Sequence, residues 1–171
     1  KPMTIWDPNK YMNMWTVKFA APDDNLLGYA QFPESSGLAG MPTTPQNAMT
    51  DGVVQTFDAF GTIEADSAGT FIMKSSYALG RTATHEVGHW VGLRHIWGDG
   101  LGCNLPAAPP GCSCLQDDYC DDTPNSEKAN YDCSGLELSF CNGVPTEDMT
   151  ANYMDYSNDA CMNIFTNDQK A

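Results

Sequence analysis

The chain has 171 residues, the size of one domain, which buries about 70% of the surface that its unfolded chain exposes. Eight Lys and Arg residues against 22 Asp and Glu residues give a net charge of −14. This charge argues against nucleic acid or an anionic membrane as partner, because both require basic patches, and it favours cationic substrates. No apolar run predicts a membrane span and no signal peptide is present, so we expect mature material from a secreted protein.

The first predicted elements are short strands, which together with one helix indicate an α/β (α+β) fold. Apolar and polar residues alternate enough in residues 12–19 to predict a strand. Residues 26–32 predict an edge strand that ends before Pro33, and residues 53–57 predict a short buried strand. Residues 98–142 are rich in Gly, Pro, Asp and Cys, so we expect an irregular, crosslinked segment there.

Residues 85–95 contain the only three histidines of the chain and follow the pattern HExxHxxGxxH. On a helix, His85 and His89 lie four residues apart and therefore face the same side, where they can share one metal ion. A continuous helix would turn His95 about 120° away from that face. Gly92 can end the helix in the left-handed conformation, which lets the chain turn and present His95 to the same ion.

Three imidazoles predict a catalytic zinc site, because they leave the fourth tetrahedral position open to water. Glu86 follows the first ligand and is predicted to act as general base and then general acid. An apolar stripe of Ala83, Val87, Trp90 and Val91 is expected to bury the helix against the sheet. Two alternatives remain: histidines without a metal ion, and a zinc site without catalysis, although the second would not require Glu86.

The HExxHxxGxxH pattern is the signature of the metzincin clan of metallopeptidases, and Asn152-Tyr153-Met154-Asp155-Tyr156 resembles the clan's Met-turn. Further segments are similar to the pappalysin family of this clan. They span nearly the whole chain and comprise residues 6–8, 10–15, 27–33, 51–54, 80–84, 122–124 and 161–166. The resemblance implies a metzincin-like catalytic domain with a twisted mixed sheet, an active-site helix, and an irregular disulfide-linked C-terminal subdomain.

The resemblance also implies roles for single residues. Met154 is expected to be an apolar cushion beneath the zinc ligands, and Tyr156 a phenol that binds zinc or hydrogen-bonds the tetrahedral intermediate; a rim tyrosine with its hydroxyl in water is the alternative for Tyr156. An extended peptide or protein substrate is expected to pair antiparallel with the edge strand. Relatives tend to cleave next to Arg or Lys, and Asp159 is a candidate for the acidic group that explains this preference.

Seven cysteines indicate an oxidising compartment. The family resemblance implies two disulfides, Cys114 with Cys141 and Cys133 with Cys161, each contributing about 3 kcal/mol by loop closure. The other three cysteines allow one further bridge plus a free thiol in any of three pairings, or a second zinc site, although no two CxxC pairs occur. These three are Cys103, Cys112 and Cys120.

Four carboxylates lie between residues 116 and 124 without a Lys or Arg among them. Such a loop repels itself unless it holds a cation, and hard oxygen ligands favour calcium, which the resemblance also implies. Asp118, Asp121 and Thr123 are the candidate ligands, and a solvated acidic loop is the alternative.

The whole chain is expected to be a single metallopeptidase catalytic domain, with an upper subdomain at 1–92 and a lower one at 93–171. The resemblance implies that the chain lacks parts of the family's catalytic domain at both ends. Two function classes follow: a secreted zinc endopeptidase that uses Glu86, and a protein-binding module that retains the cleft but does not catalyse. The sequence predicts no oligomeric state.

Overall fold

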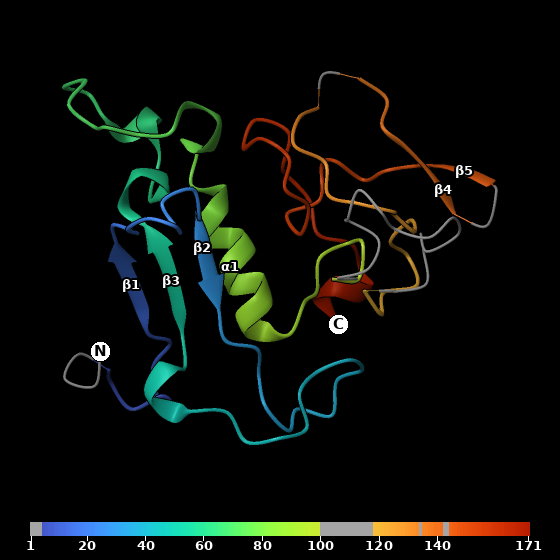
Figure 1. Ribbon diagram of the computed structural model, residues 1–171, viewed down its shortest axis with the longest axis horizontal. Coiled ribbons are helices and arrows are strands. Elements are labelled where there is room, and N and C mark those ends of the chain that lie inside the picture. Colours follow the sequence, from blue (N-terminus) through green and yellow to red (C-terminus); the bar gives the residue numbers. More distant parts are fainter. Residues whose placement is uncertain (1–4, 100–117, 134, 142–143) are drawn as a thin grey trace. The chain divides into compact units, whose positions relative to one another are not determined.

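Figure 1 shows the computed structural model of the chain, which describes residues 5–99, 118–133, 135–141 and 144–171. The chain divides into two compact units, residues 1–92 and 93–171. No helix within the described ranges is long and apolar enough to cross a membrane. That the two units form a single catalytic domain stays a prediction.

A three-stranded mixed sheet organises the first unit. The strands are β1 (Met14–Val17), β2 (Gly28–Ala30) and β3 (Val53–Thr56), in the order β1-β3-β2. Strand β3 is parallel to β1 and antiparallel to β2. All four residues of β3 are buried, as expected for a central strand, and β2 lies at an edge, as predicted.

The strands are shorter than the sequence patterns predict. Strand β3 spans only four residues, because Gly52 precedes it with a φ of 145° and a 3-10 helix, Phe57–Ala59, follows it directly. Strands β1 and β2 therefore pair with β3 only along this short stretch. The other residues of the predicted strands 12–19 and 26–32 lie outside β1 and β2.

Helix α1 (Arg81–Val91) packs against β2 and β3. It ends at Gly92, whose φ of 110° lies in the left-handed region, as the sequence predicts. Near this end, the indole nitrogen Nε1 of Trp90 donates a hydrogen bond of 2.7 Å to Oδ1 of Asp51, just before β3. The side chains that position α1 are thus partly polar.

The predicted apolar stripe on α1 is wrong. Val91 is half exposed, at 51%, and the other three members of the stripe are only partly buried. The buried positions of the helix are Thr82, His85, Glu86, Gly88 and His89. Pattern reasoning assigned the buried face to apolar residues, whereas this helix buries its chemically active side chains.

The second unit is mostly irregular, as predicted, but it also contains a hairpin. Strands β4 (Leu138–Cys141) and β5 (Val144–Glu147) pair antiparallel, and β4 lies within the stretch for which no strand was predicted. In β4 the polar Ser139 is buried and the apolar Phe140 is exposed. The hydroxyl of Ser139 accepts a hydrogen bond of 2.8 Å from the backbone nitrogen of Glu127, which explains the inverted pattern.

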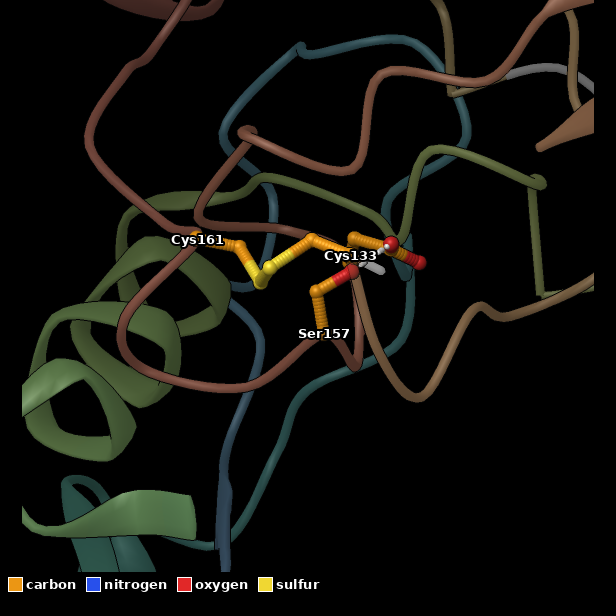
Figure 2. The surroundings of a disulfide bond; sticks show 4 residues. Cys133, Ser157 and Cys161 are labelled. Atoms are coloured by element: carbon orange, nitrogen blue, oxygen red, sulfur yellow. Dashed lines mark hydrogen bonds between the residues drawn. A yellow bond between two sulfur atoms is a disulfide. The ribbon is translucent and has the colours of Figure 1, made fainter. Parts of the chain in front are cut away.

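Disulfide bonds crosslink the second unit. Figure 2 shows the bond between Cys133 and Cys161, whose Cα atoms are 6.0 Å apart. This is the pairing that the family resemblance implies. Cys141 is also disulfide-bonded, but its predicted partner Cys114 lies outside the described residues. Cys103 and Cys112 lie outside them as well. Cys120 is a buried, reduced thiol, so the two predicted pairings that involve it are wrong, and a bridge between Cys103 and Cys112 stays a prediction.

Candidate active site

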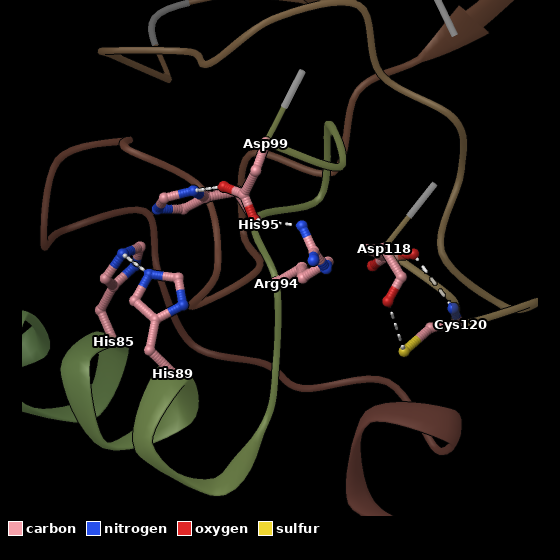
Figure 3. Close-up of polar contacts among 7 residues, drawn as sticks. All are labelled: His85, His89, Arg94, His95, Asp99, Asp118 and Cys120. Carbon is pink, nitrogen blue, oxygen red and sulfur yellow. Dashed lines mark hydrogen bonds and ion pairs between the residues drawn. The ribbon is translucent and has the colours of Figure 1, made fainter. Parts of the chain in front are cut away.

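Helix α1 places two histidine side chains side by side. Their Nε2 atoms are 3.1 Å apart, and the rings of His85 and His89 meet edge to face with centroids 4.7 Å apart (Figure 3). Two nitrogens that each lie 2.0–2.1 Å from a tetrahedral zinc ion are about 3.4 Å apart. Both side chains are buried, and the ring of Phe32 packs edge to face against His89. The pair therefore has the spacing and the fixed orientation of two ligands of one ion.

His95 follows the end of the helix by three residues. Its Nδ1 atom contacts Oδ1 of Asp99, and Nη1 of Arg94 lies 3.5 Å from Oδ2 of the same carboxylate (Figure 3). A metal-binding histidine commonly gives its other ring N–H to a carboxylate, which orients the ring and fixes the tautomer. The Asp99 contact can therefore orient the ring of His95, and in histidines held in this way the other ring nitrogen is the one that binds the metal ion.

Sequence reasoning missed Asp99. The available signal was its position four residues after the third histidine, close enough for a carboxylate to reach back to the ring. Asp99 has a φ of 60°, a left-handed conformation that Asp tolerates better than most residues. The carboxylate is thus placed beside His95 by an unusual backbone conformation that no periodic pattern predicts.

One ligand atom from each of His85, His89 and His95 lies within 4.8 Å of the other two. Among the described residues, this is the group of three or more His, Cys, Asp or Glu side chains that could hold a metal ion. Three neutral imidazoles are a ligand set that suits zinc and leaves one tetrahedral position for water or substrate. The donor chemistry of the site therefore fits a catalytic zinc ion.

Glu86 carries a buried carboxyl group next to the first of these histidines, and only 5% of the residue is exposed. Burial raises its pKa to about 8, because the charged form is removed from water. Within the described part of the chain, its Oε2 atom has no hydrogen-bond partner. Such a carboxyl group is poised to exchange a proton near neutral pH, and a neighbouring cation would favour its ionised form.

Met154 lies in a tight turn at the centre of the second unit. The turn is closed by a 3.1 Å hydrogen bond from the backbone nitrogen of Asp155 to the carbonyl oxygen of Asn152. Met154 is completely buried and packs with Ile96 and Trp97, which directly follow His95. The apolar surroundings agree with the cushion role expected for Met154, and that role stays a prediction.

Polar contacts hold this turn in place. The side-chain amides of Asn152 and Gln169 donate to each other over 2.9 and 3.3 Å. Asp155 accepts from the backbone nitrogen of Asn130 at 3.0 Å and from the hydroxyl of Ser157 at 2.6 Å. Burial nevertheless raises the pKa of Asp155, because desolvation outweighs these hydrogen bonds.

Tyr156 lies beside His95 within the second unit. The two rings meet edge to face with centroids 4.7 Å apart. The ring of Trp97 stacks on that of His95 at 4.3 Å and meets that of Tyr156 edge to face at 4.8 Å. Tyr156 is 38% exposed, so solvent or a ligand can reach it. The geometry brings this phenol next to a predicted zinc ligand.

The predicted calcium ligands have different surroundings. Asp118 is buried, and its Oδ1 atom accepts a 3.1 Å hydrogen bond from the backbone nitrogen of Cys120 (Figure 3). Thr123 is buried as well, whereas Asp121 is exposed. The neighbouring Asp122 accepts from two backbone nitrogens at the start of the last 3-10 helix, Asp168–Lys170. The hydrogen bond with the Thr166 side chain, and then these backbone hydrogen bonds, lower the pKa of Asp122. A calcium site in this loop stays a prediction.

Asp159, the candidate specificity residue, is buried in the second unit with 3% of its surface exposed. It follows Tyr156 by three residues in the segment that the Cys133–Cys161 disulfide anchors. Its predicted role in substrate preference stays a prediction.

Comparison with known families identifies the chain. A family model described as Peptidase M43, pregnancy-associated plasma protein-A, matches residues 3–171. The chain belongs to this family. The resemblance to the pappalysins that the motifs indicate is therefore confirmed, and with it the assignment to a family of metallopeptidases.

Fungal relatives of this pappalysin-family chain are named extracellular metalloproteases. One from Colletotrichum graminicola is 36% identical over 153 residues, covering 89% of the chain and 45% of the relative. Another, from Pyricularia oryzae, is 36% identical over 146 residues, covering 85% of the chain and 41% of the relative. The chain thus spans less than half the length of these relatives.

The fold of the pappalysin-family chain is similar to that of mirolysin from Tannerella forsythia. The solved structure of mature mirolysin in complex with a cleaved peptide matches 96% of the chain and 51% of that protein, with 38% identity and a TM-score of 0.72. The α+β, metzincin-like fold predicted from the sequence is confirmed by this match.

Proposed function

We propose that the chain is the catalytic part of a secreted zinc endopeptidase. The observation that carries this proposal is the cluster of three histidine nitrogens, two of them on α1 on either side of the buried Glu86. Family membership supports the activity, and the names of the fungal relatives support an extracellular location.

The three histidines would hold the ion, and Asp99 would orient His95 through its Nδ1 atom. A bound zinc ion would supply Lewis-acid activation of water and of the scissile carbonyl. Glu86 would accept the proton of the attacking water and pass it to the departing amine. Its burial supports this role, because desolvation raises the pKa of the carboxyl group to about 8, so the group can bind and release a proton near neutral pH.

Tyr156 would act as a hydrogen-bond donor to the oxygen on which negative charge develops. Its ring contacts to His95 and Trp97 fix its position beside the third histidine. A donor aimed at the developing charge contributes about 3 kcal/mol in comparable sites.

The substrate is proposed to be a peptide bound in extended form. Strand β2 is an edge strand of the sheet and packs against α1, and an edge strand is the element with which an extended substrate pairs antiparallel. The structure of mirolysin with a cleaved peptide supports the same substrate class. We propose no nucleic-acid or membrane partner, since the net charge is −14.

A preference for Arg or Lys next to the cleaved bond is proposed to depend on Asp159. A buried carboxylate attracts a basic side chain strongly, because little water screens the pair. An Asp159→Asn variant should lose the preference while its cleavage of neutral sites continues. Persistence of the basic preference in this variant would exclude Asp159 as its cause.

We also propose a structural calcium ion bound by Asp118, Asp121 and Thr123. The buried hydroxyl of Thr123 has no hydrogen-bond partner in the described part of the chain, which leaves an oxygen ligand available. Calcium should raise the midpoint of thermal unfolding in the wild type. A variant with Asp118→Asn and Asp121→Asn that responds equally to calcium would exclude this site.

The alternative of a non-catalytic binding module is not favoured, because the site retains Glu86 beside the three histidines. The proposal is tested by digesting a denatured protein mixture and sequencing the new termini. We expect cleavage that a zinc chelator stops and added zinc restores, with termini enriched next to Arg or Lys. Cleavage that continues at full rate after complete zinc removal would refute the proposal.

A further inference from the structure

Strand β2 contributes more to the site than an open edge. Gly28, its first residue, lies directly against the side chain of Glu86. A Cβ atom added at Gly28 would meet three atoms of that side chain: Oε1 at 2.5 Å, Cδ at 2.8 Å and Cγ at 2.8 Å. Real Cβ atoms are not found this close to other heavy atoms, so an alanine at position 28 and the present position of Glu86 are incompatible.

The backbone conformation of Gly28 does not explain the glycine. Gly28 is paired with Gln55 in the ladder between β2 and β3, and it is not among the glycines with positive φ. Any residue could adopt this extended conformation. The requirement for glycine therefore comes from the space that the carboxyl group occupies.

Glu86 has little freedom to avoid a larger residue. It projects from α1, which packs on β2 and β3, and only 5% of the residue is exposed. Gln55, opposite Gly28 on the central strand, is completely buried. Cγ and Cδ of Glu86 would be displaced as well as its carboxylate oxygen, so a turn of the carboxylate alone does not relieve the overlap.

We propose that Gly28 is a positioning residue for Glu86. Because Gly28 has no side chain, β2 leaves the space that the Glu86 carboxyl group occupies, and this space holds the carboxyl group where it transfers protons. This inference rests on the proposed function, in which Glu86 transfers protons. Proton transfer requires a hydrogen-bond distance to the attacking water, and a displacement of about 1 Å costs about 10²-fold in rate.

The contact itself is tested by unfolding in urea, which does not depend on catalysis. Gly28→Ala should lower the urea midpoint in the wild type. In the Glu86→Ala background the same change should leave the midpoint unchanged or raise it, because alanine is favoured over glycine in a strand once the overlap is gone. An equal loss in both backgrounds, or a loss in neither, would overturn the proposal.

The consequence for catalysis is tested by kinetics on zinc-loaded protein. Gly28→Ala should lower kcat by about 10²-fold with an unchanged KM. In the Glu86→Ala background, which lacks all three atoms that the added Cβ would meet, Gly28→Ala should leave the residual cleavage unchanged. A raised KM with normal kcat would show that Gly28 makes room for substrate instead, and an equal fall in kcat in both backgrounds would also contradict positioning.

The matched control is Gly135→Ala. Gly135 has no positive φ, and no atom of the residues that the structure describes lies within 4 Å of an added Cβ. It should change neither the urea midpoint nor kcat. Failure of the proposed function would appear separately, as wild-type protein that cleaves nothing when loaded with zinc, and the urea experiment would then still decide whether Gly28 holds Glu86.

Discussion

At the scale of single residues, the phenol of Tyr156 has a defined place but a proposed role. Tyr156→Phe keeps the ring, and therefore the contacts with His95 and Trp97. We expect kcat to fall about 10²-fold while KM and zinc content stay close to wild type, because only the hydrogen-bond donor is removed. Steady-state kinetics on a peptide substrate measure this effect.

The control for this variant is Tyr131→Phe. Its ring lies 6.0 Å from that of Tyr156, and the residue is 65% exposed, so loss of its hydroxyl should leave kcat unchanged. An equal fall in both variants would show that a general change in the aromatic cluster, and not oxyanion stabilisation by Tyr156, causes the loss.

The buried carboxyl group of Asp155 makes stability depend on pH. Burial raises its pKa, so the folded state holds this proton more tightly than the unfolded chain does. The resulting stabilisation is present below the ordinary pKa of 3.8 and is lost as pH rises through the folded-state pKa. Asp155→Asn does not ionise, and it can still accept from Asn130 and donate to Ser157.

We therefore expect the free energy of unfolding of Asp155→Asn to rise relative to wild type as pH increases from 3.8 through the folded-state pKa of Asp155. Urea unfolding of both proteins at each pH measures the difference. A difference that stays constant with pH would mean that Asp155 keeps its ordinary pKa in the fold.

At the scale of elements, the end of α1 determines where the third histidine lies. Gly92 has a φ of 110°, and a Cβ atom there would meet Cδ1 of Leu38 at 2.6 Å. Gly92→Ala should lower the free energy of unfolding by about 2–3 kcal/mol, from left-handed strain plus this overlap, and should weaken zinc binding. Urea unfolding and a zinc titration measure the two effects.

Gly61→Ala is the control for this experiment. Gly61 also has a positive φ, of 87°, but nothing lies within 4 Å of an added Cβ. It should lose only the backbone contribution of about 1–2 kcal/mol and keep full zinc affinity. If Gly61→Ala weakened zinc binding as much as Gly92→Ala, the helix end would have no special role.

The elements also show how far the sequence determines the site. The HExxHxxGxxH spacing predicts both the helical pair and its end at Gly92, because these follow from helix geometry alone. Periodicity did not predict the buried face of α1, because the apolar residues of the predicted stripe are only partly buried or are exposed. The contact of Gly28 with Glu86 depends on the approach of two elements that are distant in sequence. The contact of Asp99 with His95 depends on the left-handed backbone conformation of Asp99, which the spacing of four residues does not predict.

At the scale of the whole molecule, we expect a chain with few regular elements to depend on crosslinks for its stability. The Cys133–Cys161 bond closes a loop with a sequence separation of 28. Chain entropy then predicts that Cys133→Ser with Cys161→Ser lowers the free energy of unfolding by about 3–4 kcal/mol. Urea unfolding without reductant measures it, and a stability equal to wild type would show that packing alone holds this segment.

The central claim is that three histidines bind one zinc ion and that Glu86 acts beside it. The most direct measurement determines zinc content and peptide cleavage on the same preparations of wild type, Glu86→Ala and His95→Ala. The account predicts about one zinc ion per chain in wild type and in Glu86→Ala, weaker zinc retention in His95→Ala, and a fall in cleavage of about 10³-fold in Glu86→Ala. Cleavage by zinc-loaded Glu86→Ala at the wild-type rate would contradict it.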